Sequence, residues 1–299
     1  MRYKGWLIYN GGLLTKKFIE LNEWYVESAK KLAIDLLPIA NSELFCQIEE
    51  GKVTLEPQLT RPDFVLFLDK DIQLACQLES LGLQVFNSAN TIEVCDNKLL
   101  MHQQLAQAEL PQPLTIFAPM LFSHVKEPNP AFLDHVEEKL GYPLIAKEGF
   151  GSFGEQVYMV DDRHQLEAIA RKLLHKPHLF QAYIKSSHGQ DIRVHVVGDR
   201  VVASMKRVSE LDFRANVTRG GKMFKIEPSD AFSELAIAAS KAVGADFSGV
   251  DLLIGPNDEP IICEVNSNAH IKNIYQATSI DVSDYIFEHI LTTLKSHSS

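Results

Sequence analysis

The chain has 299 residues, 45% of them hydrophobic and 23% charged, which is typical of a well-cored globular protein with more than one compact unit. Its formal net charge of −10 argues against a general binder of nucleic acids or acidic membranes, because their phosphate groups are held by an excess of lysine and arginine. No apolar run reaches the roughly 18 residues of a membrane span, and the short one near the start is too brief for a signal sequence. Four scattered cysteines without CxxC spacing disfavour a disulfide scaffold or a zinc site and favour the cytoplasm.

Strand-like and helical patterns alternate from residue 1 to about residue 88, as in an open α/β layer. The periodicity predicts strands at 5–9, 64–68 and 83–86 and helices at 21–37 and 72–81. A single long helix is then expected from the capping residue Ser88 to about Gln107.

Two further units are expected after this layer. In 89–185, a loop leads to short strands and helices around the glycine-rich turn GFGSFG, which predicts a small lobe. In 186–299, two hairpin patterns and two helical patterns predict a second lobe. We therefore expect three domains, which comprise residues 1–88, 89–185 and 186–299. The expected helices are 131–140, 163–174, 229–243 and 281–294, the strands 143–147, 155–160 and 178–184, and the hairpins 191–207 and 247–265.

Three oxygen-bearing side chains in the last hairpin make a candidate metal site. If Ile254 pairs with Ile261, Asp251 lies directly opposite Glu264, with the two Cβ atoms about 4.5–5.5 Å apart. Side chains alternate along a strand, so Glu264 and Asn266 share a face. Two opposed carboxylates repel each other unless a cation lies between them, and an all-oxygen donor set suits magnesium better than zinc. The alternative is that both acids lie on a solvated face.

Two lysines are candidates for phosphate contacts. Lys147 ends the strand at 143–147, and the glycine-rich loop follows at once, so its backbone N–H groups could approach phosphate oxygens. The loop is not a Walker-type P-loop, nor a dinucleotide fingerprint, because no Gly-Lys-Ser/Thr and no helix follow it. An ordinary flexible hairpin is the alternative. The second candidate, Lys98, lies on the long predicted helix, and the alternative is that it is a solvated surface charge.

Arginines gather between residues 193 and 219, and their guanidinium groups suit carboxylates and phosphates. If Val197 pairs with Arg200, alternation puts four side chains on one face: Asp191, Arg193, His195 and Lys206. Arg207 then points away unless a bulge redirects it. His195 by itself fits a packed or solvated histidine better than an acid–base group.

Taken in order, these motifs resemble the ATP-grasp ligases of the RimK type over roughly residues 85–280. The resemblance rests on NSANTIEVCDNK, PLIAKEGFGSFGEQV, QAYI, GQDIRVHVVGD, MKR, DFRANVTRGG, GVDLLI and EVNSNAH. It implies an α/β protein in which an N-terminal open pre-ATP-grasp domain precedes two α+β lobes that clamp ATP. Ala182 departs from the pattern, since an acidic residue is usual there, and so does the linker at 186–188.

The resemblance also implies roles for single residues. Arg193 and Arg207 are candidates for holding the carboxylate substrate or its acyl phosphate, and Arg214 and Asn216 for the reacting centre. The magnesium ligands are Asp251, Glu264 and Asn266, with manganese as another metal for the same site. The implied nucleotide contacts are Lys98, Lys147, Gly151, Ser152, Phe153, Gln181, Ala182, Tyr183, Asp191, Arg214, Ala215 and Asn216.

The implied reaction is the ATP-dependent joining of a carboxylate to an amine through an acyl phosphate, for example the addition of glutamate to a small molecule or peptide. The partners expected are these substrates, ATP and magnesium, without nucleic acid or membrane, and self-association stays open. The alternatives are an ATP-binding regulatory protein that has lost catalysis and a kinase on the same ATP clamp. A nicotinamide dehydrogenase is disfavoured, because Asn10-Gly11-Gly12 is too thin a fingerprint.

Overall fold

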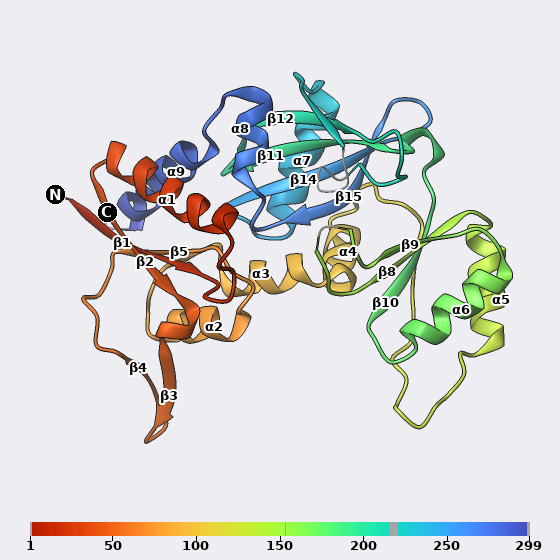
Figure 1. Cartoon of the computed structure of the whole chain (residues 1–299), viewed down its shortest axis with the longest axis horizontal. Helices are drawn as coiled ribbons and strands as arrows, with labels where there is room; N and C mark the ends of the chain where they lie inside the picture. The colour runs from red at the N-terminus through yellow and green to blue at the C-terminus, as the bar shows by residue number, and fades with distance from the viewer. Residues whose placement is uncertain (1, 153, 216–220, 298–299) are drawn as a thin grey trace.

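The structure is a computed structural model that describes residues 2–152, 154–215 and 221–297. It has an N-terminal parallel sheet at one end, a small four-stranded lobe at the other and a five-stranded sheet between and above them (Figure 1). In these ranges no helix combines the length and apolar character needed to cross a membrane. The three-unit division at 88 and 185 remains our proposal.

The N-terminal sheet is parallel, with strand order β2-β1-β5-β6. Helix α1 (Lys16–Lys31) packs on one face and α2 (Ile72–Ser80) on the other, since their buried side chains join two different cores. This confirms the expected open α/β layer. The strands are β1 (Tyr3–Tyr9), β2 (Ile34–Ala40), β5 (Phe64–Phe67) and β6 (Val85–Phe86).

The helix predicted at 21–37 has the wrong boundaries. Helix α1 ends at Lys31, and Ala33 turns the chain with a φ of 55°. Leu36 then lies in β2, where it is buried on the same face as Ile34. The spacing of two residues between Ile34 and Leu36 fits a strand, while the spacing of four between Leu32 and Leu36 also fits a helix.

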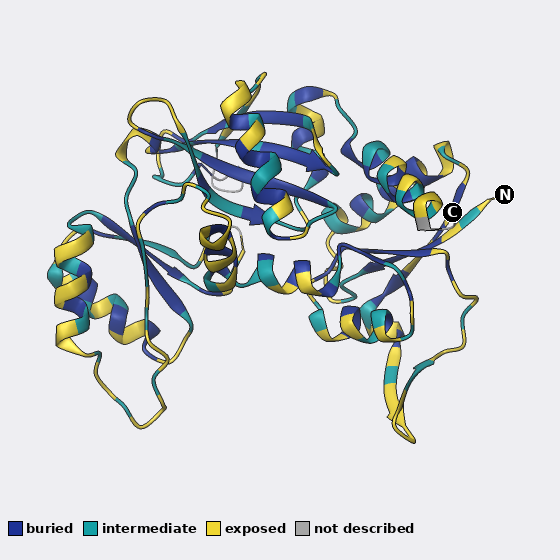
Figure 2. Ribbon diagram, turned by 180° about the vertical axis from the view of Figure 1, so that it is seen from behind, coloured by how far each residue is buried: buried dark blue, intermediate teal, exposed yellow. Residues whose placement is uncertain are grey.

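A two-stranded hairpin was also not predicted. It consists of β3 (Phe45–Glu49) and β4 (Lys52–Glu56), follows the short 3-10 helix η1 (Asn41–Glu43), and projects from the N-terminal sheet (Figure 1). Figure 2 shows its outer part largely exposed, in contrast to the buried strands of the three main sheets.

The long helix predicted from Ser88 is broken in two. Helix α3 (Ala89–Asp96) ends at Asn97, whose φ of −103° and ψ of 102° are not helical, and α4 (Lys98–Gln107) begins immediately after it. The Asn97 side chain caps α4 by accepting from the backbone N–H of Leu99 at 3.0 Å. The break places Lys98 in the first turn of α4, where its backbone N–H donates to the carbonyl oxygen of Gly149 at 2.9 Å.

The small lobe is an antiparallel sheet in the order β7-β10-β8-β9. Helices α5 (Pro130–Leu140) and α6 (Arg163–Leu173) cover one face through a shared apolar core, which leaves the other face toward the rest of the molecule (Figure 1). The edge strand β7 was not predicted. The strands are β7 (Thr115–Phe117), β8 (Leu144–Glu148), β9 (Val157–Val160) and β10 (His178–Ala182).

The third sheet has the order β13-β12-β11-β14-β15. Helix α7 (Asp230–Ala242) packs on one face, while α8 (Ile271–Thr278) and α9 (Val282–His297) pack on the other together with α1. Both hairpins are confirmed, whereas β13 and α8 were not predicted. The strands are β11 (Gln190–Val197), β12 (Arg200–Val208), β13 (Lys222–Lys225), β14 (Phe247–Ile254) and β15 (Pro260–Asn266), with the 3-10 helix η2 (Lys185–Ser187) before β11.

Candidate active site

Asp251 and Glu264 lie directly opposite each other in the β14–β15 ladder, as the sequence predicts. The pairing from which this was argued is wrong, because Ile254 pairs with Pro260 rather than with Ile261. The register shifts by one residue next to Asp251, and this bulge restores the predicted opposition. The extra residue is Cys263, which therefore does not follow the simple alternation expected of it.

A second bulge redirects the arginines of the β11–β12 hairpin. Val197 pairs with Arg200 as predicted, but the register shifts between His195 and Val196. Beyond the shift, Arg207 lies opposite Asp191 and joins the face that carries the acids. Lys206 was expected on that face and is instead opposite Ile192, one of the core residues of the other face.

Two buried arginines tie together two buried aspartates on this face. Arg193 donates from Nε and Nη2 to Asp251 at 2.6 and 2.7 Å, and Arg207 donates in the same way to Asp191 at 2.6 and 2.5 Å. Arg207 Nη2 also lies 3.0 Å from Asp251. Burial raises the pKa of Asp251, but the two guanidinium groups outweigh it and lower the pKa to about 2.

These pairs limit what the two arginines can do for a substrate. Each guanidinium carries five N–H donors, and the contacts with the aspartates use those on Nε and Nη2. Arg193 and Arg207 can therefore offer Nη1 to a carboxylate or phosphate, while their main partners are the protein's own acids.

Lys98 and Glu264 form the other ion pair of the site. Their charged atoms lie 3.3 Å apart, and Lys98 is only 6% exposed, so the interpretation of this lysine as a solvated surface charge is wrong. Burial raises the pKa of Glu264, but Lys98, together with Lys147, outweighs it and holds the pKa below its usual value. The carboxylate is thus kept ionised.

The donor set fits a magnesium ion, although the carboxylate pair does not by itself require one. The repulsion between Asp251 and Glu264 is already relieved by the protein's own cations. Asn266 donates from Nδ2 to the Gly249 carbonyl at 3.3 Å, which leaves Oδ1 as an acceptor on the same face. The described residues contain no cluster of three His, Cys, Asp or Glu side chains suited to a metal. In the set proposed here, the third donor is instead the amide oxygen of Asn266.

Lys147 reaches from the small lobe to the third sheet. It lies on the face of β8 that α5 and α6 leave uncovered, is 7% exposed, and its Nζ is 3.9 Å from Cys263 Sγ on β15. The two lobes therefore meet at this lysine, with the Asp251–Glu264 pair beside it.

The glycine-rich loop after β8 needs its glycine at position 151. Gly151 has a φ of +153°, and a Cβ there would lie 2.4 Å from Gln156 Oε1, which accepts from the Ser152 N–H at 3.2 Å. Lys70, after β5, donates to Ser152 Oγ at 3.1 Å and so joins the loop to the N-terminal sheet. Phe153, another expected nucleotide contact, lies outside the described residues.

Arg214 holds the base of that loop. It donates from Nη1 to the carbonyl oxygens of Gly154 at 2.6 Å and Val157 at 3.1 Å, and pairs with Asp212. Ala215 is buried beside it, and Asn216 lies outside the described residues. In this structure Arg214 links the two lobes.

The expected linker contacts lie at the end of β10. Gln181 is 2% exposed, the Ala182 N–H donates to the Leu114 carbonyl at 2.9 Å, and the Tyr183 hydroxyl is hydrogen-bonded to His188. Because its N–H is engaged, Ala182 can offer only its carbonyl oxygen to a nucleotide base.

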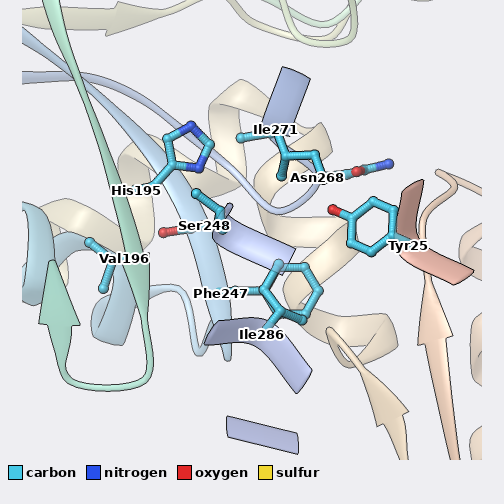
Figure 3. A pocket seen from close by; sticks show the side chains of 10 residues that line it. Tyr25, His195, Val196, Phe247, Ser248, Asn268, Ile271 and Ile286 are labelled. Carbon is cyan, nitrogen blue, oxygen red and sulfur yellow. The ribbon is translucent and has the colours of Figure 1, made fainter. Parts of the chain in front are cut away.

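His195 is a packed histidine, which agrees with the sequence analysis that disfavoured an acid–base role. It is 2% exposed, and burial lowers its pKa to about 3, so it stays neutral. It faces a cavity of about 10 Å³ that Tyr25 and Asn268 also line (Figure 3). This volume is roughly that of one water molecule.

Sequence reasoning missed the side chains that surround Gln181 and Lys147. His102 is hydrogen-bonded to both Gln181 and Gln112, and Cys263 contacts Lys147. The position of Cys263 follows from the β14–β15 bulge, which pairing arithmetic does not reveal. No spacing rule connects a histidine on α4 to a glutamine on β10, because the contact is made by tertiary packing.

Comparison with known proteins places these features in a family. A profile described as RimK-like ATP-grasp domain matches residues 95–290. N-acetylaspartylglutamate synthase A of Homo sapiens is 35% identical over 86% of this chain and 65% of its own length. Beta-citrylglutamate synthase B of Danio rerio is 31% identical over 88% of this chain and, again, 65% of its own length. The chain therefore spans slightly less than two thirds of the length of these relatives.

The fold has solved counterparts. A structure of the ATP-grasp ligase PsnB with minimal precursor, Mg and ADP superposes with a TM-score of 0.70 over 97% of both chains, at 18% identity. This confirms the expected ATP-grasp fold.

Proposed function

The chain belongs to the RimK-like ATP-grasp family, and on that basis we propose that it is an ATP-dependent ligase joining a carboxylate to an amine. The observation that carries the proposal is the meeting of Lys98 and Lys147 with the Asp251–Glu264 pair between two lobes. This arrangement suits a nucleotide triphosphate held with a divalent metal.

The balance of charge supports this assignment. Four cations against three carboxylates leave a surplus of one positive charge, before any metal is added: Lys98, Lys147, Arg193 and Arg207 against Asp191, Asp251 and Glu264. Asp251, Glu264 and Asn266 would hold magnesium, or manganese, which would supply further charge neutralisation for the phosphates.

The chain's own residues then have distinct tasks in our proposal. Lys147 and Lys98 bind phosphate oxygens, and the Nη1 groups of Arg193 and Arg207 hold the substrate carboxylate or the acyl phosphate made from it. Arg214 and the glycine-rich loop close the site, which excludes water that would hydrolyse the acyl phosphate. An amine then attacks the acyl carbon, and ADP and phosphate leave.

Glutamate is the amine that we propose first. The names of both relatives contain glutamate joined to another acid. The carboxylate partner is a small molecule or a peptide end.

The test is a coupled assay with magnesium and ATP, in which glutamate and a panel of carboxylic acids are combined and products are identified by mass. An amide that appears together with ADP supports the ligase. ADP formed with an acid alone and no amide with any amine indicates a kinase. Nucleotide binding without turnover for any pair indicates a regulatory protein.

A further inference from the structure

We propose that Lys70, at the edge of the N-terminal sheet, is a positioning residue that prepares Ser152 of the glycine-rich loop to donate a hydrogen bond to a phosphate oxygen of ATP. The inference rests on the proposed ATP-dependent function and gives the N-terminal sheet a part in closing the loop over the nucleotide.

The backbone around Lys70 is fixed just beyond the carboxyl end of β5. Its N–H donates to Asp69 Oδ1 at 2.8 Å, and its carbonyl oxygen accepts from the Ile72 N–H at 2.9 Å. Asp69 is 7% exposed and accepts from Asn10 Nδ2 at 3.1 and 3.2 Å. The half-exposed Lys70 side chain therefore projects from a rigid base.

The Lys70 ammonium group joins two other elements. It pairs with Asp96, the last residue of α3, and donates to Ser152 Oγ at 3.1 Å. An ammonium group can only donate, so Ser152 Oγ is the acceptor and the hydroxyl hydrogen is directed elsewhere. Within the ranges that the structure describes, that hydrogen has no acceptor. The Ser152 hydroxyl is therefore prepared as a donor.

The glycine-rich loop is also held at both of its ends. At the start, the Gly149 carbonyl oxygen accepts from the Lys98 N–H of α4 at 2.9 Å. At the end, the Gly154 carbonyl oxygen accepts from Arg214 Nη1, between β12 and β13, at 2.6 Å. Lys70 adds an attachment from the N-terminal sheet in the middle, so three separate parts of the molecule hold this one loop.

A phosphate oxygen is the acceptor that suits the Ser152 hydroxyl. The loop follows directly on Lys147, which in our proposal binds phosphate, and hydrogen bonds to charged acceptors are stronger than those to neutral ones. A hydroxyl whose oxygen accepts from an ammonium group is polarised into a better donor. Lys70 and a phosphate on the two sides of Ser152 should therefore strengthen each other's hydrogen bond.

The pair of Lys70 with Asp96 does not by itself account for the arrangement, because a half-exposed ion pair contributes little to stability. What Asp96 does is fix the ammonium group beside Ser152. Asp96 and Lys98 flank the break at Asn97, between α3 and α4. The break thus sets the Lys70 ammonium group and the start of the loop relative to each other.

The test is a double-mutant cycle on nucleotide binding, measured by calorimetry with magnesium and AMPPNP, an ATP analogue that is not hydrolysed at its γ-phosphate. Lys70→Met and Ser152→Ala should each weaken binding roughly three- to tenfold. The double variant should bind no more weakly than Ser152→Ala, because Lys70 acts through that hydroxyl. Lys70→Arg keeps donors for both partners and should stay within about twofold of the wild type. Lys52→Met, at an exposed site on β4, is the control and should not change the affinity.

The outcomes separate this proposal from the function on which it rests. Losses that multiply in the double variant are what a purely structural role of Lys70 predicts, and they would overturn the positioning role. Wild-type affinity in Lys70→Met would overturn it as well. If the wild type does not bind the analogue at all, the ATP-dependent function fails together with the inference.

Discussion

Arg207 and Asp191 form a buried, two-point ion pair because one extra residue, Val202, shifts the register between β11 and β12. Without that bulge, Lys206 would lie opposite Asp191 and Arg207 would point into the other face. The site's charge balance thus depends on a local irregularity of the sheet.

Replacing Arg207 should destabilise the fold. Arg207→Met leaves Asp191 buried without its cation, and we expect the free energy of unfolding to fall by about 3–5 kcal/mol. Urea denaturation followed by circular dichroism measures the change. Arg207→Met with Asp191→Leu should recover much of the loss, and a double variant no more stable than the single one would contradict the account.

Replacing Lys147 should weaken ATP binding. Lys147→Ala removes a buried charge where the lobes meet, and the KM for ATP should rise roughly ten- to hundredfold. Steady-state ADP release at varied ATP gives the value. Lys206→Ala is the matched control, because that lysine lies on the other face of the third sheet, and its KM should not change. An unaltered KM in Lys147→Ala refutes the phosphate role.

Acid should destabilise the protein partly through Asp251. Its pKa is lowered from 3.8 to about 2, the cation attraction outweighing burial, so the folded state binds its proton less readily than the unfolded chain. The contribution to stability is therefore present above pH 4 and is lost as the pH falls from about 4 to 2. Unfolding free energies across this range should fall less steeply in Asp251→Asn. Equal slopes in the two proteins would show that this carboxylate is not held ionised.

The order of most elements was predictable from sequence because apolar periodicity reports the face that packs. That is why β1, α2, α6 and both C-terminal hairpins appear near their expected positions. The spacing of Leu36 fits both a helix and a strand, and only packing in the N-terminal sheet decides between them. The pattern also predicts one long helix through Asn97, whereas the Asn97 side chain caps a second helix.

The site was predictable in its opposed carboxylates and much less so in its cations. Asp251 and Glu264 share a hairpin, so local register brought them together. Lys98 and Lys147 reach Glu264 and Cys263 from other elements, and no local rule shows that. The two bulges also escape pairing arithmetic, because an extra residue leaves no distinct signal in the pattern of apolar residues.

The most direct test of the central claim is the magnesium dependence of ADP binding in Asp251→Asn with Glu264→Gln, measured by calorimetry after circular dichroism has established that the variant is folded. In the wild type, magnesium should tighten ADP binding. In the double variant, we predict the same affinity with and without magnesium, together with loss of magnesium-dependent ATP turnover. A double variant that keeps the wild-type magnesium effect and turnover would contradict the assignment of this pair as the metal site.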